Sequence, residues 1–379
     1  MENVKRFNTT GPCFPDEHYM LPALDRLPGI RELVAGGSYF VVHAPRQTGK
    51  TTVLQSLVQE INEKGDMFAI YCTLETMQNA TDVDDTMIKI CKLLRRGVFA
   101  TPELVDRLGN PDVALAISQE SGWTVTAVSD TLAALCRKAG KPVVVFFDEA
   151  DCLVGDVLIS FLRQLRDGYV NRKLIPFPKS IALVGMLDVR DYKAQIRSDG
   201  ESLGQISPFN IIAEDMLIPN FTEPDIRTLY AQHTAATGQV FADGVVDDVW
   251  RLTRGQPWLV NAIAHECVAK IHGSRYDEVI TVADVEAAKE AIIRRNPVHL
   301  DYLFYIASYP SIKPFFDAAL NGSVSDTQRE EKQFRLLLHL GLLCECGGGF
   351  EFSNPAYKEY WAIRKGGSLF TNDNCNNCS

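Results

Sequence analysis

Long apolar runs are missing from this chain of 379 residues. A membrane-spanning helix needs about 20 consecutive apolar residues, and no stretch of the sequence approaches that length without a charged side chain. The first residues, MENVKRFNTTG, also lack the apolar segment of a signal peptide. We therefore expect a soluble, cytoplasmic protein that does not enter a membrane.

An excess of basic charge is missing too. The 38 Lys and Arg residues are outnumbered by 48 Asp and Glu residues, which gives a formal net charge of -10. Nucleic acid and anionic membranes attract positively charged proteins, so the chain as a whole is a poor partner for either. Any contact with nucleic acid would have to be local.

The ten cysteines lack the regular spacing of a disulfide framework. Most of them lie inside apolar segments, so we predict reduced and mostly buried thiols. What the sequence has in quantity is apolar residues, at 46%. A chain of this length and composition can form two or three domains with real cores.

Strand and helix patterns alternate between residues 38 and 220. Apolar strand patterns lie at 38–43, 67–74, 142–147 and 180–186, with a further candidate at 209–221, and helical patterns separate them at 51–64, 82–97, 124–138 and 156–169. Alternation of this kind, with strands apolar throughout, predicts an α/β fold in which helices cover both faces of a parallel sheet.

After residue 220 the pattern is helical, and then it changes once more. Helices are expected from Thr222, Asp243, Pro257 and Thr281, and the last segment combines helices, one of them over 325–340, with a short Gly-turn hairpin typical of a winged helix. We divide the chain into a mostly irregular lead-in (1–37), an α/β core (38–220), a helical subdomain (221–296), a winged helix (297–365) and a disordered tail (366–379).

The segment APRQTGKTT, at 44–52, follows the first strand and opens a helix. It matches the phosphate loop G-x-x-x-x-G-K-[ST] except that Ala44 replaces the first Gly. Backbone N–H groups near Gly49 approach the phosphates, Lys50 bridges the β- and γ-phosphates, and the Thr51 hydroxyl binds Mg²⁺. The residues predicted to bind ATP or ADP here are Ala44, Pro45, Arg46, Gln47, Thr48, Gly49, Lys50, Thr51 and Thr52.

A second motif, VVVFFDEAD, ends a buried strand about a hundred residues later. At the carboxyl end of that strand, Asp148 is placed to bind Mg²⁺, directly or through water, and Glu149 to polarise the attacking water. The predicted metal ligands are thus Thr51 and Asp148, and the predicted catalytic residues are Lys50 and Glu149. The strand at 180–186 is expected to lie between the two motif strands, with Arg190 just beyond it as a candidate for sensing the γ-phosphate.

Further patches are RGQPWLV at 254–260, GMLDVRDY, PNFTEPDI and NPAYKEYW. Together with the two motifs they resemble the STAND branch of AAA+ ATPases, in particular its prokaryotic AAA-like and archaeal-ATPase-like groups. The resemblance implies that Gly255 and Pro257 form a turn facing the nucleotide. It also implies that the lead-in supplies an adenine pocket, for which the candidates are Thr9, Thr10, Gly11, Pro12 and Tyr19.

These observations predict a slow ATPase, dependent on ATP and Mg²⁺, that works as a nucleotide-dependent conformational switch. STAND proteins usually carry a fused effector, so the resemblance implies a protein partner acting in trans. It leaves open a homo-oligomer in which Arg163, Arg166 or Arg172 acts as an arginine finger.

Two alternatives stay open: a DNA-binding initiator or loader that uses the winged helix, and a nucleotide-stabilised binding module with negligible turnover. Residues 298–365 carry eight acidic and seven basic side chains, so binding of nucleic acid is not favoured.

Overall fold

The computed structural model describes residues 4–109, 123–188 and 208–364. The chain divides into two compact units. The sheet unit comprises Ala23–Ala44 and Lys50–Ile218, and the helical unit comprises Met1–Pro22, Pro45–Gly49 and Pro219–Ser379. The central residues of the APRQTGKTT segment therefore group with the helical unit, whereas Ala44 and Lys50 on either side of them belong to the sheet unit.

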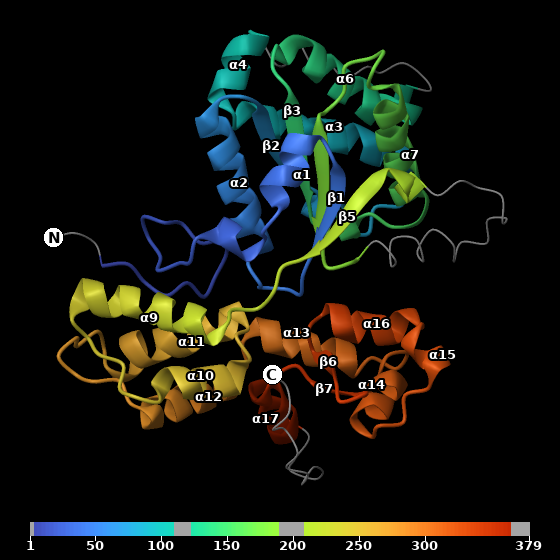
Figure 1. The fold of residues 1–379 in the computed structure, drawn as a ribbon. Coiled ribbons are helices and arrows are strands. Elements are labelled where there is room, and N and C mark those ends of the chain that lie inside the picture. The colour runs from blue at the N-terminus through green and yellow to red at the C-terminus, as the bar shows by residue number, and fades with distance from the viewer. Residues whose placement is uncertain (1–3, 110–122, 189–207, 365–379) are drawn as a thin grey trace. The chain divides into compact units, whose positions relative to one another are not determined.

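A five-stranded parallel sheet forms the centre of the sheet unit, with the strand order β2-β3-β4-β1-β5 (Figure 1). The strands are β1 (Tyr39–His43), β2 (Phe68–Thr73), β3 (Val143–Asp148), β4 (Ser180–Gly185) and β5 (Ile212–Leu217). This confirms the predicted α/β class and the parallel sheet. It also confirms that the strand at 180–186 lies between the two motif strands.

Burial explains why these segments are strands. Every residue of β3 and β4 is buried, as expected for inner strands that helices cover on both faces. The edge strand β5 is instead exposed at most positions. Asp148 is the last residue of the buried strand β3. Its carboxylate therefore lies at the side of the sheet where the carboxyl ends of the parallel strands meet.

Helices cover each face of the sheet. They are α1 (Ile30–Gly36), α2 (Lys50–Lys64), α3 (Val83–Phe99), α4 (Pro102–Leu108), α6 (Ala127–Ala139) and α7 (Gly155–Asn171), together with the short 3-10 turns η1 (Ala23–Arg26), η2 (Glu75–Met77), η3 (Trp123–Val125), η4 (Ala150–Cys152) and η5 (Pro208–Ile211). One face packs against α3, α4, α6 and α7. Helix α2 packs on β2, and α1 on β1 and β4.

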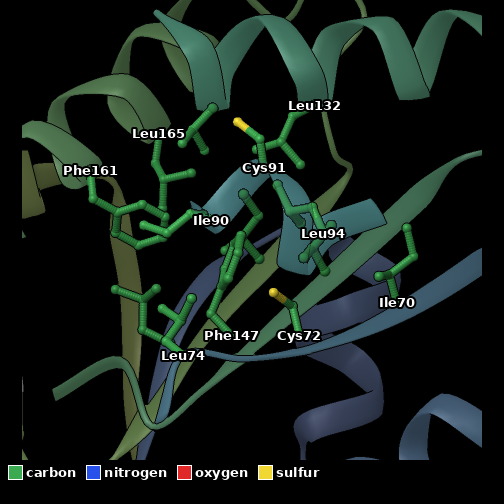
Figure 2. Packing of buried hydrophobic residues seen from close by; sticks show 14 of the residues in the cluster. Ile70, Cys72, Leu74, Ile90, Cys91, Leu94, Leu132, Phe147, Phe161 and Leu165 are labelled. Carbon is green, nitrogen blue, oxygen red and sulfur yellow. The ribbon is translucent and has the colours of Figure 1, made fainter. Parts of the chain in front are cut away.

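The main core lies between the sheet and α3, α6 and α7. Figure 2 shows Cys72 and Phe147 from the strands pointing toward Ile90 and Leu94 of α3. Phe147 also meets Phe161 of α7 edge to face, with ring centroids 5.1 Å apart. Burying a large aliphatic or aromatic side chain contributes about 1.5–3 kcal/mol, so this layer accounts for much of the stability of the sheet unit.

The helical unit contains, in order, α9 (Glu223–Thr237), α10 (Val245–Thr253), α11 (Pro257–His265), a π-helix η6 (Glu266–Ile271), α12 (Val282–Arg295), α13 (Val298–Ala307), α14 (Lys313–Leu320), α15 (Asp326–Arg329), α16 (Lys332–His339), the antiparallel strands β6 (Leu343–Cys346) and β7 (Gly349–Phe352), and α17 (Pro355–Arg364). The expected caps at Thr222 and Thr281 are present, each as a reciprocal capping box with the Asp three residues later.

The start of the chain packs into the helical unit. Phe7 and Tyr19 are 3% and 2% exposed, and their rings lie 5.6 Å and 5.4 Å from that of His233 on α9. The backbone N–H of Met20 donates to Gln232, which in turn donates to the Met20 carbonyl. The first part of the lead-in is thus anchored by aromatic packing, a role that its Pro and Gly content did not indicate.

The structure differs from the sequence predictions in detail. The mostly irregular lead-in also contains the short helix α1, whose buried Ile30 and Val34 lie one turn apart, and α4 was not predicted. The helix expected over 325–340 is two helices, because Glu331 has extended backbone angles that end one before the next begins. The helix expected from Pro257 is present and continues to Ile271, with π-helical geometry from Glu266. The helix expected from Asp243 begins at Val245, after Gly244 in a left-handed conformation.

The described cysteines Cys13, Cys72, Cys91, Cys136, Cys152, Cys267 and Cys344 are free thiols. Cys346 is instead disulfide-bonded, so the prediction of reduced thiols fails at that position. Cys375, Cys378 and the tail from 366 lie outside the described residues. Among the described helices, none combines the length and the apolar character needed to cross a bilayer.

Candidate functional site

The loop after β1 makes a tight turn. Gln47 and Gly49 have φ values of 59° and 94°, and the Thr48 hydroxyl donates to the carbonyl of Pro45 over 2.8 Å. The backbone N–H of Ala44 donates to Gly185 O of β4 over 3.2 Å. A non-Gly residue such as Gln47 rarely adopts positive φ, and such conformations concentrate at functional sites.

Lys50 is the first residue of α2 and is only 6% exposed. Its ammonium group donates to the carbonyl of Ala44 over 3.0 Å, across the base of the loop. The first N–H groups of a helix have no partners within the helix, and its N-terminus favours anions. A buried cation beside a helix N-terminus forms an environment suited to phosphate.

Asp148 is 1% exposed and accepts hydrogen bonds at both carboxylate oxygens. Its Oδ2 accepts from the Thr51 hydroxyl and from the Tyr71 hydroxyl, each over 2.8 Å, and its Oδ1 accepts from the backbone N–H of Glu149 over 3.0 Å. The structure therefore brings together Thr51 and Asp148, which lie 97 residues apart in sequence. A carboxylate and a hydroxyl on adjacent elements are the hard oxygen ligands that Mg²⁺ prefers.

Glu149 has φ 55° and ψ 40°, a left-handed conformation. For a residue with a Cβ this costs about 1–2 kcal/mol, so the surrounding structure must hold it in place. It begins the turn η4, in which Asp151 Oδ2 accepts a hydrogen bond from the N–H of Met186 over 3.3 Å. The tip of β4 is thus tied to the acidic motif, whereas Arg190 lies outside the described residues.

The RGQPWLV turn lies in the helical unit. Gly255 has φ 72°, and a Cβ built there would lie 1.8 Å from the carbonyl oxygen of Phe221, whose N–H donates to Gly255 O over 2.9 Å. Pro257 is the first residue of α11 and its carbonyl accepts from Asn261 over 2.8 Å. The turn is therefore a close backbone crossing that only glycine fits.

Several other residues that the sequence suggested for nucleotide binding or as an arginine finger make contacts inside the unit to which they belong. The Trp258 indole N–H donates to the carbonyl of Thr9 over 2.9 Å, and Tyr19 belongs to the aromatic core around His233. In the helical unit, the Arg46 guanidinium lies 4.4 Å from the ring centroid of Tyr302. In the sheet unit, Arg172 stacks 3.9 Å from the ring centroid of Tyr169, next to the end of α7.

A pocket of about 580 Å³ also opens in the sheet unit. Its lining includes Ser129, Asp156, Arg163 and Gln164, and no lining residue belongs to the phosphate-loop segment or the acidic motif. Gln164 is occupied in holding the start of α6, since its Oε1 accepts from the N–H of Val128 over 2.8 Å. We assign this pocket no part in the candidate site.

Tyr71 is the residue of this site that the sequence did not reveal. It lies in the middle of β2, in a segment FAIYCT that is recognisable only as a strand. Its proximity to Asp148 follows from the pairing of β2 with β3, and a single sequence does not show which strands pair.

A parallel sheet of this order, with the APRQTGKTT loop between β1 and α2 and Asp148-Glu149 at the end of β3, defines a P-loop ATPase fold. The profile of the AAA-like domain family matches residues 28–363, and the chain belongs to that family.

Solved structures are similar to this chain at low sequence identity. The Walker-type ATPase PABY2304 of Pyrococcus abyssi aligns with a TM-score of 0.59 at 16% identity, over 93% of this chain and 99% of that one. The RuvB Holliday junction branch migration motor of Thermotoga maritima gives 0.44 at 13% identity over 87% and 90%, and the ADP form of Aeropyrum pernix ORC2 gives 0.41 at 15% over 90% and 91%. The first likeness supports the fold. A search of curated proteins found no match.

Proposed function

We propose that this protein binds ATP with Mg²⁺ and hydrolyses it slowly. In this proposal the backbone and side chains of residues 44–52 hold the phosphates, and Lys50 neutralises the charge of the β- and γ-phosphates. Thr51 and Asp148 hold the metal, and Glu149 orients and polarises the attacking water. When bound, Mg²⁺ would supply Lewis-acid stabilisation of the phosphate charge.

The observation that carries the proposal is the hydrogen bond of 2.8 Å between Thr51 Oγ1 and Asp148 Oδ2. Two oxygen ligands from separate motifs meet where the parallel strands end, and the preceding residue, Lys50, is buried with its ammonium donating to the Ala44 carbonyl. These residues fit the group, because Mg²⁺ is bound by few protein oxygens and by the phosphates themselves. A chance match to the loop pattern would not bring the second motif within hydrogen-bonding distance.

Glu149 adds independent support. Its backbone is strained and its N–H is fixed to the neighbouring Asp148, which is how a catalytic side chain is held at a set position next to a metal ligand.

The test is nucleotide binding together with phosphate release by three proteins. Wild type should bind ATP and release phosphate, Lys50→Ala should lose binding, and Glu149→Gln should bind ATP but lose at least about 100-fold in turnover. Equal phosphate release by wild type and Glu149→Gln would contradict hydrolysis at this site. It would favour instead the nucleotide-stabilised module.

We further propose that the protein is a STAND-type switch, organised as a lead-in (1–37), an ATPase core (38–220), a lid (221–296) and a winged helix (297–365). Support comes from the sequence patches quoted above and from the order of α13, α14, α15, α16, the β6–β7 hairpin and α17. A ligand shifts a conformational equilibrium only by its difference in affinity between two states. The switch proposed here requires ATP and ADP to differ in this way.

Mass photometry with no nucleotide, with ADP and with a non-hydrolysable ATP analogue tests the switch. A nucleotide-dependent change in particle mass is expected if a homo-oligomer forms, and the same sample shows any partner added in trans. Dynamic light scattering on the same three samples measures the hydrodynamic radius. If neither the particle mass nor the hydrodynamic radius changes among the three conditions, the switch is contradicted.

The alternative of a DNA-binding initiator draws little support from the residues most suited to it. Arg329 lies 3.6 Å from Glu345 and 3.9 Å from Asp326, and its guanidinium stacks 5.0 Å from the ring centroid of Phe350. An arginine neutralised by two carboxylates and packed on a hairpin is a weak phosphate ligand. Salt-dependent DNA binding that is lost on charge reversal of Lys332 and Arg335 would restore this alternative.

A further inference from the structure

Tyr71 belongs to no nucleotide-binding motif, yet its hydroxyl donates to the carboxylate at the centre of the candidate site. The distance from Tyr71 Oη to Asp148 Oδ2 is 2.8 Å, equal to that from Thr51 Oγ1 to the same oxygen. One carboxylate oxygen thus receives two hydroxyl donors. The Thr51 hydroxyl belongs to the loop, whereas the Tyr71 hydroxyl comes from the neighbouring strand.

The strand register places Tyr71 there. β2 pairs with β3 so that Tyr71 is opposite Phe146 and Thr73 is opposite Asp148. Because side chains alternate between the faces of a sheet, Tyr71 and Asp148 share one face, while Cys72 and Phe147 point into the main core on the other. Tyr71 lies diagonally across the strand pair from Asp148, within reach of a long side chain.

The strand that carries Tyr71 is closely packed at this position. Gly97 of α3 approaches it so closely that a Cβ there would lie 2.6 Å from both Ile70 Cγ2 and the Tyr71 carbonyl oxygen. The backbone that presents the hydroxyl is therefore held against α3.

The Tyr71 hydroxyl is a neutral donor, and it donates to the Asp148 carboxylate. A neutral donor fixes the orientation of a carboxylate without cancelling the negative charge that a cation needs.

We propose that Tyr71 is a positioning residue for divalent-metal binding, holding the Asp148 carboxylate in the rotamer that a nucleotide-bound Mg²⁺ requires. The proposal rests on the function proposed above. Asp148 Oδ1 accepts a hydrogen bond from the N–H of Glu149. By holding the Asp148 carboxylate, Tyr71 therefore also supports the start of the strained turn that carries Glu149. Partners that orient a metal ligand typically contribute about 10- to 100-fold to metal affinity.

The experiment compares wild type with Tyr71→Phe, which deletes one oxygen atom and keeps the ring. The affinity for a fluorescent ADP is measured in EDTA and at rising concentrations of free Mg²⁺. The ratio of the two dissociation constants reports how strongly metal and nucleotide are coupled. Titration of Mn²⁺ by electron paramagnetic resonance, with ADP present, measures metal binding directly and does not depend on turnover.

For Tyr71→Phe we expect ADP affinity in EDTA to stay within about twofold of wild type and the metal-dependent gain to fall by about 10-fold. Mn²⁺ should bind more weakly by a similar factor. The matched control is Tyr39→Phe in the same sheet, because the Tyr39 hydroxyl is buried and donates to the carbonyl of Pro178 over 3.0 Å. Its coupling ratio should equal that of wild type, whatever its melting temperature.

Two outcomes would overturn the positioning role. One is a coupling ratio for Tyr71→Phe equal to that of wild type. The other is an equal loss of ADP affinity in EDTA and in Mg²⁺, which would show that Tyr71 only supports the fold. Failure of the wild type itself to bind ADP would instead contradict the proposed function, so the two failures are distinguishable.

Discussion

Glu149 combines backbone strain with a proposed role in catalysis, and the two can be separated by substitution. Its φ of 55° suits glycine, which adopts the left-handed region without a Cβ clash. Glu149→Gly should therefore raise the free energy of unfolding by about 1 kcal/mol while turnover is lost. Urea denaturation and phosphate release on the same preparation measure both quantities.

The control for this prediction is Glu149→Ala. It should lose turnover equally but gain no stability, because alanine keeps the Cβ. A Gly variant no more stable than the Ala variant would show that the turn is not strained in solution.

His299 provides a prediction about pH. Burial, and next the positive charge of Arg46, lower its pKa from 6.5 to about 4, and its Nε2 lies 3.1 Å from the Tyr357 hydroxyl. The unfolded chain takes up a proton near pH 6.5, whereas the folded protein does so only near pH 4. Between these values the free energy of unfolding should fall by about 1.4 kcal/mol for each unit of acidification.

Replacing His299 by Gln removes this titration while keeping a polar partner for Tyr357. Urea denaturation at pH 7 and pH 5 should then show a loss of stability smaller in the variant by about 2 kcal/mol. Identical losses in both proteins would mean that His299 is not held neutral in the folded state.

At the scale of elements, the turn between α10 and α11 depends on a close backbone crossing. Gly255→Ala would place a Cβ 1.8 Å from the Phe221 carbonyl oxygen, in a residue with φ 72°. The crossing would have to open, at the expense of the hydrogen bond from Phe221 N. We expect a loss of about 3 kcal/mol or more in the free energy of unfolding of the helical unit, measured by urea denaturation.

Gly238→Ala is the matched control. Gly238 ends α9 with φ 80°, but its Cβ would meet nothing within 4 Å. It should show only the cost of the positive φ, about 1 kcal/mol. Equal losses at the two positions would show that the crossing at Gly255 relaxes at no cost.

The elements that the sequence predicts well are those with a long apolar period or a strong cap. The strand VVVFFD and the helix capped by Thr222 are examples, since burial and a reciprocal cap act locally. The short α4 was missed although it has local signals, with Pro102 in its first turn and Gly109 after its last residue. The break at Glu331 lies inside a helical pattern that continues on both sides. Thr51 and Asp148 could be chosen from their local motifs, whereas Tyr71 required knowledge of strand pairing.

At the scale of the whole molecule, the boundary between the two units falls within the phosphate loop. Pro45–Gly49 belong to the helical unit, while Ala44 and Lys50 belong to the sheet unit. Lys50, Thr51 and Asp148, the residues proposed to hold phosphate and metal, all belong to the sheet unit, so a bound nucleotide should stabilise the folded state of that unit. An ATP analogue present with Mg²⁺ at about 100 times its dissociation constant contributes about 2.7 kcal/mol of linked stability.

Differential scanning calorimetry can test this prediction on the full chain. With the analogue and Mg²⁺ we expect the unfolding transition of the sheet unit to move upward by roughly 5–10 °C, because about 1 kcal/mol corresponds to 2–4 °C for a unit of this size. Lys50→Ala should show no shift, since it lacks the ammonium that pairs with phosphate. Wild-type unfolding transitions that do not move with the analogue and Mg²⁺ would contradict nucleotide binding at this loop.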